Sequence, residues 1–265
     1  MNDELVVFYI NRDADTERRV SLEEKLAHIF PRAERISAVN GRQLPTELEP
    51  FFPPSSLKPG EVGCYASHML VWNEIVGRRL RYALILEDDV DIDIDVKALI
   101  SEILTVLPRG WDYVHLDGRP RSRRFAFRTI ATLRQDRKLV RYARIPDGTV
   151  AQLVSAQGAR KLLAVVPRHV AVDVDIRTPW RWNLDLYGVT PSPFGHAAFA
   201  SAIRKLGGNS RHRSWTGSGY RSPFSFVFNV RKLGLLFWMI CAAQMAEQKW
   251  RRFLSRDRLP PRRPH

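Results

Sequence analysis

Runs of apolar residues alternate with helix-like segments along the first half of the chain. Leu5–Ile10 is continuously apolar, which predicts a buried strand of a parallel sheet. Between Thr16 and Pro31 an apolar stripe recurs at helical spacing, formed by Val20, Leu22, Leu26, Ile29 and Phe30. Arg35–Val39 is a second strand-like run, and an Asn-Gly turn pair follows it. A strand, a helix and a strand in this order predict a parallel α/β sheet.

The same alternation predicts further elements downstream. Residues 44–60 hold five prolines, which indicates an irregular excursion. We expect helices over Glu61–Arg79, Val96–Leu107 and Ser155–Val165, and strands over Arg81–Leu86, Trp111–Leu116, Val150–Val154 and Leu186–Val189. The Arg-rich stretch 119–145 is interpreted as a hairpin that turns near Asp136. Together these elements predict an α/β domain with a mainly parallel sheet flanked by helices.

Charge divides the chain into two parts. It has 265 residues and a formal net charge of +14, from 42 basic and 28 acidic side chains. Residues 201–265 hold 14 of the basic residues and 2 of the acidic ones, so the first 200 residues are nearly neutral. We therefore expect a catalytic domain over residues 1–200 and a basic, partly amphipathic helical extension over 201–265.

The cysteines and the apolar segments bear on the cellular setting. Cys64 and Cys241 make neither a disulfide framework nor a metal-binding spacing, which favours a reducing, cytoplasmic setting. Met1–Ile10 lacks the charged start and long apolar core of a signal peptide. The longest apolar run, Leu233–Ala243, has eleven residues and is too short to cross a bilayer.

Three consecutive acids, Glu87-Asp88-Asp89, follow the expected strand Arg81–Leu86 directly. Adjacent carboxylates repel one another, and a divalent cation such as Mg²⁺ or Mn²⁺, which prefers oxygen ligands, would remove that conflict. The end of a strand in an α/β sheet is also where such folds bind ligands. The pattern therefore favours a metal site, and a solvated turn after an ordinary strand is the alternative.

Four blocks of this sequence resemble family-25 glycosyltransferases, the group of lipopolysaccharide and lipooligosaccharide sugar transferases related to collagen galactosyltransferases. They lie in the expected order within residues 5–195: Tyr9–Arg12 with Arg18-Arg19; Ile36–Gly41; Gly60–His68 with Trp72 and Ala83–Val90; and Gly158–Leu163 with Val172–Asp175. The third block is the most specific.

The resemblance implies a GT-A-like nucleotide-diphospho-sugar transferase fold and an inverting hexose transfer from a UDP-sugar, often UDP-galactose. The acceptor would be a saccharide of lipopolysaccharide or lipooligosaccharide. It further implies a divalent metal, Mn²⁺ or Mg²⁺, at the acidic motif. Asp89 is the first choice for a metal ligand, Glu87 would face the metal, its water shell or the ribose, and His196 would complete the metal shell.

Several polar residues near the expected strand ends are candidates for binding the nucleotide sugar. Arginine makes bidentate contacts with phosphate, and we expect the turn at Asn40-Gly41 to lie near the base or ribose. The candidate donor-binding residues are Asn11, Arg12, Arg19, Asn40, Gly41, Ser67, His68, Glu87 and Asp88. The competing interpretations are an exposed helix start for the arginines, a simple turn for Asn40-Gly41 and a packed core histidine for His68.

Asp173 and Asp175 are candidates for the catalytic base. If the segment is extended, side chains one residue apart point to the same face, so that one acid acts as base and the other supports it. A surface turn with two acids is the alternative. Family members often carry Tyr where this chain has Gln152 and Asp where it has Asn40, which leaves the donor sugar and the acceptor open.

The basic C-terminal extension combines aromatic and apolar residues with flanking cations. Phe224–Lys232 leads into the apolar run, and Lys249, Arg251, Arg252, Arg256, Arg258, Arg262 and Arg263 follow. This pattern is typical of an interfacial helix on an anionic membrane. A helix docked on the domain is the alternative, and nucleic-acid binding ranks last because no groove-reading or stacking motif is present.

Two other function classes compete with the transferase. One is a non-catalytic scaffold that keeps the fold and binds polyanions or a membrane. The other is a metal-dependent phosphohydrolase, which would cleave the donor without an acceptor.

Overall fold

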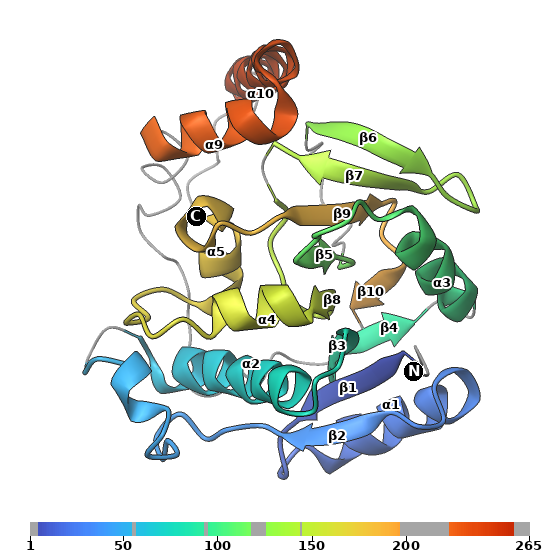
Figure 1. Cartoon of the computed structure of the whole chain (residues 1–265), viewed down its shortest axis with the longest axis vertical. Coiled ribbons are helices and arrows are strands. Elements are labelled where there is room, and N and C mark those ends of the chain that lie inside the picture. Colours follow the sequence, from blue (N-terminus) through green and yellow to red (C-terminus); the bar gives the residue numbers. More distant parts are fainter. Residues whose placement is uncertain are drawn as a thin grey trace, which may run out of the picture.

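The computed structural model describes residues 5–54, 57–92, 95–117, 126–143, 145–196 and 223–256. Its centre is an eight-stranded sheet made of β1 (Val6–Asn11), β2 (Glu34–Ser37), β3 (Tyr82–Glu87), β5 (Tyr113–His115), β6 (Phe127–Thr132), β7 (Lys138–Tyr142), β8 (Ala151–Ser155) and β9 (Leu186–Thr190). The strand order is β2-β1-β3-β8-β5-β9-β7-β6 (Figure 1). A small second sheet pairs β4 (Val90–Ile92) with β10 (Phe194–His196).

The direction of the strands confirms the predicted α/β class. The pairings β1–β2, β1–β3 and β5–β9 are parallel, and only β8 and β7 run against the other strands of the large sheet. The carboxyl ends of β1, β2 and β3 therefore lie at one edge. The register places Asn11 opposite Ser37 and Ile10 opposite Glu87.

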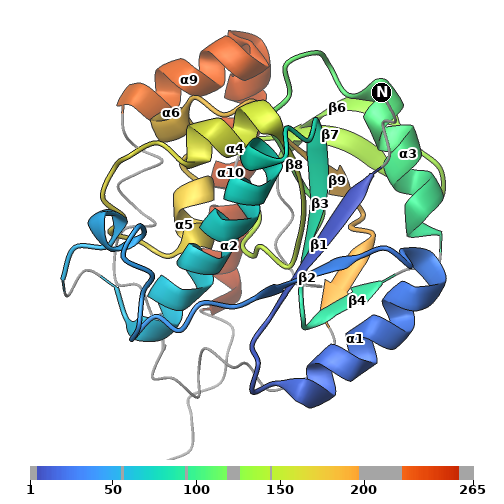
Figure 2. The ribbon, with the colours of Figure 1, turned by 60° about the horizontal axis from the view of Figure 1, so that its bottom comes forward.

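Helices cover both faces of the large sheet (Figure 2). The main ones are α1 (Thr16–Ile29), α2 (Pro59–Gly77), α3 (Val96–Val106) and α4 (Ala156–Leu162). Helices α1 and α3 bury their apolar stripes with Val7 and Leu84 on one face. Helix α2 packs with Phe8 and Ile85 on the other, and Trp72 on this helix is fully buried, as expected for a core residue.

Most predicted elements are confirmed, and their boundaries follow from local chemistry. Helix α2 begins at Pro59, two residues earlier than expected, because proline fits the first helical turn and the Lys58 backbone N–H donates to Glu61 Oε2 at 3.1 Å. The described part of the Arg-rich stretch forms the β6–β7 hairpin, and Gln135 and Asp136 in its turn both adopt positive φ. Helix α4 ends at Leu162 rather than at Val165.

One prediction about local structure is wrong. The segment that contains Asp173 and Asp175 is not extended but forms the short helix α5 (Val172–Ile176). Residues two apart on a helix diverge by about 200°, so the two carboxylates do not share a face. The short strands β4 and β10, the helix α6 (Pro179–Trp182) and the single 3₁₀ turn Glu49–Phe51 had no clear sequence signal.

The described part of the C-terminal extension is helical, as predicted. It comprises α9 (Pro223–Leu233) and α10 (Leu235–Arg256), which lie beside the β6–β7 hairpin in Figure 1. Ala126 and Ala143 of the hairpin region bury a small apolar cluster with Leu233 and Cys241. The expected domain boundary at residue 200 lies outside the described residues.

Candidate active site

A pocket of about 410 Å³ lies where β1, β2 and β3 end and α2 begins. Its volume falls in the range of about 300–1,000 Å³ that is typical of small-molecule sites. Parallel strands bring their carboxyl ends to one edge, which explains why segments far apart in sequence meet here. Of the predicted site residues, the pocket gathers Asn11, Arg12, Asn40, Gly41, Ser67, His68, Glu87, Asp88 and Asp89.

One wall of the pocket depends on two glycines. A Cβ added to Gly41 would lie 1.9 Å from the Pro59 carbonyl oxygen, and one added to Gly63 would lie 2.5 Å from the Val39 carbonyl oxygen. The loop after β2 therefore rests directly on the first turns of α2. Ser67 fastens this contact, because its hydroxyl donates to the Gly63 carbonyl at 2.6 Å and accepts from the Val39 N–H at 2.9 Å.

The hydrogen bond of the Asn40 side chain is local, whereas Ser67 joins the loop after β2 to α2. The Asn40 side-chain oxygen accepts from the Arg42 N–H at 3.1 Å, as in an Asx turn. Asn40, Gly41 and Ser67 thus shape the loop and the wall of the pocket. The turn interpretation of Asn40-Gly41 is confirmed, and the same turn lines the cavity; its contact with a nucleoside stays a prediction.

Asp88 is held by two partners inside the pocket wall. Asn11 Nδ2 donates to Asp88 Oδ2 at 2.8 Å, and Arg18 Nη1 lies 2.6 Å from Asp88 Oδ1, with both charged side chains 11% exposed. Burial raises the pKa of Asp88, and the hydrogen bond from Asn11 and the charge of Arg18 oppose this shift. Both carboxylate oxygens are engaged, so Asp88 positions Arg18 at the pocket.

The structure selects a different arginine from the one that the sequence suggested. Arg18 lines the pocket, whereas the predicted Arg19 is not among its lining residues and faces Glu23 at 3.9 Å. Consecutive helical residues point about 100° apart, so only one of the two can face the cavity. Arg12 lines the pocket as predicted and lies 3.4 Å from Asp15.

Glu87 is oriented by a chain of hydrogen bonds. Its Oε1 accepts from Thr149 Oγ1 at 2.6 Å and lies 3.2 Å from His68 Nε2, while His68 Nδ1 lies 3.0 Å from Gln152 Nε2. With Gln152 donating to Nδ1, His68 carries its proton on Nε2 and donates it to Glu87, a tautomer assigned from the network. His68 is therefore both a packed residue and a support for the acidic motif.

Two sets of side chains in the pocket have donor atoms suited to a metal. Glu87 and Asp89 offer carboxylate oxygens, and the β4–β10 register places His196 opposite Val90, the residue after Asp89. The side chain of His196 lies outside the described residues. Carboxylate oxygens suit Mg²⁺ and Mn²⁺, so this set fits the cation expected from the sequence.

The second set contains Cys64, His68 and Glu87, whose donor atoms lie within 4.8 Å of one another. Sulfur and imidazole donors suit a softer cation such as Zn²⁺. Burial and the nearby charges of Glu87 and Asp173 raise the pKa of Cys64 well above its usual range, which keeps the thiol protonated. Glu87 belongs to both sets, and the carboxylate set matches the Mg²⁺ or Mn²⁺ expected from the sequence.

The two late aspartates differ in their surroundings. Asp175 is fully buried and accepts from Tyr65 Oη at 2.9 Å and from Arg181 Nη1 at 2.5 Å. It ties α5 to α2 and α6, so the structure does not favour it as a base. Burial raises the pKa of Asp173, the charge of Arg177 opposes the shift, and the charges of Asp147 and Glu87 add to it. Asp173 is not among the residues that line the pocket, but its carboxylate is close enough to Glu87 for the two charges to interact.

Arg18 and Cys64 lie in the family blocks but were not among the predicted site residues, and Asp117, which does not line the pocket, was not considered. Asp117 follows β5, is 2% exposed and bridges to Phe194 at the start of β10. The sequence signal was an apolar strand that ends in an acid, His115-Leu116-Asp117, the same pattern that marks Glu87 after β3.

The family of this chain follows from a match between its sequence and a family model. The model of glycosyltransferase family 25, described as a lipopolysaccharide biosynthesis protein, matches residues 5–177. The chain belongs to glycosyltransferase family 25. The mainly parallel α/β sheet, with the acidic motif at the end of β3, agrees with the expected α/β class, and the GT-A-like topology that the resemblance implied stays a prediction.

Curated relatives agree with this assignment. A glycosyltransferase 25 family member of Aedes aegypti is 28% identical over 191 residues, which cover 67% of this chain and 31% of the relative. Procollagen galactosyltransferase 1 of Danio rerio is 29% identical over 154 residues, which cover 57% and 25%. An inactive glycosyltransferase 25 family member 3 of Mus musculus is 27% identical over 184 residues, which cover 64% and 30%. The chain thus spans only about a quarter to a third of the length of these relatives.

Among solved structures, the chain is similar to a glycosyltransferase involved in glycosylation of the major capsid of PBCV-1. The TM-score is 0.38 at 9% sequence identity, and the match covers 77% of this chain and 97% of that one. A TM-score this low carries no functional argument.

Proposed function

We propose that this family-25 chain transfers a hexose from a UDP-sugar to a hydroxyl group of a saccharide acceptor, with inversion at the anomeric carbon. The observation that carries the proposal is the pocket itself. It brings the carboxylates of the acidic motif and the guanidinium groups of Arg12 and Arg18 into one cavity beside the loop 38–42. A diphosphate needs both kinds of group, a divalent cation and cationic side chains, to balance its charge.

Each side chain of the pocket has a defined task in this proposal. Glu87 and Asp89 would hold a divalent cation, Mn²⁺ or Mg²⁺, which supplies Lewis-acid stabilisation of the leaving diphosphate. His68 and Thr149 keep Glu87 oriented through their hydrogen bonds to Oε1. Arg12 and Arg18 would contact phosphate oxygens, and the turn at Asn40-Gly41 would lie against the nucleoside.

Asp173 is the proposed general base. A carboxyl group whose pKa is raised by burial is better matched to proton removal near neutral pH than an exposed one. Asp173 would accept the proton of the acceptor hydroxyl while the oxygen of that hydroxyl bonds to the anomeric carbon. The bond between that carbon and the diphosphate oxygen breaks, and UDP leaves. Attack opposite the leaving group inverts the anomeric configuration.

We propose galactose as the first sugar to test and a lipopolysaccharide-type saccharide as the acceptor. The names of the relatives support galactose, since two kinds of procollagen galactosyltransferase are among them. The description of the family model supports the saccharide acceptor. Because the chain covers only part of those relatives, donor and acceptor are to be decided by assay.

The second candidate function is a non-catalytic scaffold, which the similarity to an inactive family member favours. Thermal unfolding and UDP release, measured with and without Mn²⁺ over a panel of UDP-, GDP-, CMP- and ADP-sugars, separate the two. A ligand at about 100 times its dissociation constant stabilises the folded state by about 2.7 kcal/mol.

If the chain is a transferase, we expect a Mn²⁺-dependent rise in melting temperature with one UDP-sugar, and UDP release that depends on the acceptor. A shift without turnover, with every acceptor tried, would leave the scaffold as the better explanation. Equal UDP release with and without acceptor would instead indicate donor hydrolysis, as expected of the phosphohydrolase.

A further inference from the structure

The two C-terminal helices expose an unusual number of large apolar side chains. We call this set the outer face of α9–α10; its members are between 44% and 77% exposed, and they are Phe224, Phe226, Val227, Leu235, Leu236, Met239, Ile240 and Trp250. In the rest of the described chain only Val20, Val165 and Val166 are exposed large apolar residues. Scattered apolar residues need no explanation, but a concentration on one helical pair marks an interaction surface.

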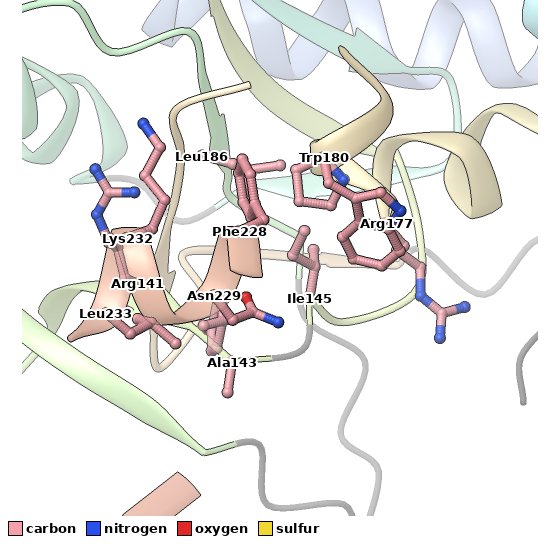
Figure 3. Close-up of a pocket in the computed structure, with 12 residues that line it drawn as sticks. Arg141, Ala143, Ile145, Arg177, Trp180, Leu186, Phe228, Asn229, Lys232 and Leu233 are labelled. Carbon is pink, nitrogen blue, oxygen red and sulfur yellow. The ribbon is translucent and has the colours of Figure 1, made fainter. Parts of the chain in front are cut away.

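The opposite side of the pair is fixed to the domain. Phe228, Asn229, Lys232 and Leu233 of α9 line a small pocket together with Ile145, Trp180 and Leu186 of the domain (Figure 3). Lys232 Nζ lies 2.9 Å from Asp185 Oδ1, and Leu233 is 3% exposed. The alternative of a helix docked on the domain therefore holds for α9, while the side chains of the outer face are exposed.

A glycine sets the angle between the two helices. Gly234 adopts φ +82° between α9 and α10, a conformation that favours glycine, and the axes of Phe226–Leu233 and Leu235–Ala243 are bent by 116°. Among the described residues no single helix is long and apolar enough to cross a bilayer, although the two helices of this bent pair together have the length and apolar composition of a membrane span. Because one side of α9 is bound to the sheet domain, lipid cannot surround it. The geometry fits a pair that lies against a bilayer surface.

The charge of the pair indicates which surface it would meet. Residues 223–256 contain six Lys and Arg residues and a single acid, Glu247. Lys232 is paired with Asp185, and Arg231 is exposed. Cations next to apolar side chains are attracted by anionic headgroups while the apolar groups enter the interface. A second copy of the same cationic surface would be repelled, which disfavours self-association.

We propose that the outer face of α9–α10 docks the protein on an anionic lipid bilayer. The apolar side chains enter the headgroup region, and the basic residues interact with the lipid phosphates. The ion pair of Lys232 with Asp185 and the buried Leu233 hold the surface in a fixed orientation to the sheet domain. This inference does not depend on the sugar-transfer proposal.

Co-sedimentation of the full chain with vesicles tests the proposal. The vesicles are phosphatidylcholine alone or phosphatidylcholine with phosphatidylglycerol. The test variant replaces Leu236, Met239 and Ile240 by Glu, three exposed positions on one side of α10. The matched control replaces Val20, Val165 and Val166 by Glu, which changes the net charge equally at exposed apolar sites elsewhere.

We expect the unmodified chain and the control to bind the anionic vesicles, more weakly at high salt, and the test variant to bind at least about tenfold more weakly. No binding by the unmodified chain, or equal binding by both variants, would overturn the proposal. Light scattering adds a further check, since a dimer that only the test variant disrupts would identify a protein–protein interface instead. Equal melting temperatures exclude unfolding as the cause, and the single variant Leu236→Glu serves if the triple one does not fold.

Discussion

The pocket at the ends of β1, β2 and β3 and the C-terminal helical pair use charge in opposite ways. In the pocket wall, cation and carboxylate are paired at short range inside the fold, as Arg18 and Asp88 are at 2.6 Å. On α9–α10, cations accompany apolar side chains that face outward. Buried charge is costly unless it is paired, so the pocket charges are fixed by their partners. Surface charge stays available for association and is screened by salt.

This comparison predicts that the two regions can be disabled separately. Variants in the pocket should change turnover and leave vesicle binding intact, and variants on α10 should do the reverse. The predictions below run from the largest expected effect to the smallest.

Replacing Asp89 by Ala should abolish sugar transfer, with a loss of at least about a hundredfold, because it removes an oxygen from the proposed metal site. The matched control is Asp91→Ala, an exposed acid two residues away that pairs with Lys25. Initial rates of Mn²⁺-dependent UDP release measure the effect. Unchanged turnover of the Asp89 variant would remove this residue from the site.

Replacing Asp173 by Asn should lower kcat by about 10²–10⁴-fold, as expected for loss of a general base. Because burial raises the pKa of Asp173 in the folded state, ionisation of this group opposes folding. Its favourable contribution is present below its ordinary pKa and is lost as pH rises through the raised value. The variant should therefore be at least as stable as the parent at neutral pH, and the acid limb of its pH–rate profile should disappear.

Asp175→Asn is the contrasting variant. It leaves Arg181 and Tyr65 without their buried carboxylate partner, so we expect a loss of about 3 kcal/mol in the free energy of unfolding. Urea unfolding measures the free energy of unfolding of the Asp173→Asn and Asp175→Asn variants. If Asp173→Asn is the destabilised one and keeps its turnover, the roles that we assign to the two aspartates are reversed.

Arg18→Ala should raise KM for the donor by about tenfold or more, the loss expected when a charged hydrogen-bond partner is removed. It should also destabilise the fold, since Asp88 would keep only the hydrogen bond from Asn11. Arg19→Ala, on the neighbouring residue outside the pocket, should change neither quantity appreciably. Titrating each variant with the donor shows which arginine binds phosphate: Arg18, which lines the pocket, or Arg19, which the sequence analysis named.

Ser67→Ala should have the smallest effect, a loss of about 1–2 kcal/mol in stability with a modest rise in KM. It removes the hydrogen bonds that join the loop after β2 to α2. The matched control is Ser101→Ala, an exposed helical serine that donates to the Lys97 carbonyl at 3.1 Å. Neither variant should change vesicle binding. A change in vesicle binding with Ser67→Ala would show that the pocket and the helical pair are coupled.

Local patterns in the sequence were sufficient for most of the secondary structure. The continuous apolar run before Asn11 and the one before Glu87 predicted β1 and β3, because buried parallel strands are apolar on both faces. The acidic motif was recognisable because three adjacent carboxylates have no structural reason of their own. The family, too, followed from short motifs, since the residues that carry it lie within contiguous blocks.

The tertiary structure decided how the individual side chains are used. Arg18 and Arg19 are indistinguishable in sequence, and only the orientation of α1 selects the one that meets Asp88. Asp173 and Asp175 looked equivalent until α5 turned one toward Tyr65 and Arg181 in the core. The sequence by itself determined most of the longer elements and where the acidic motif lies, because those depend on neighbours along the chain. The assignment of each charge to a partner depends on neighbours in space, which only the packed fold provides.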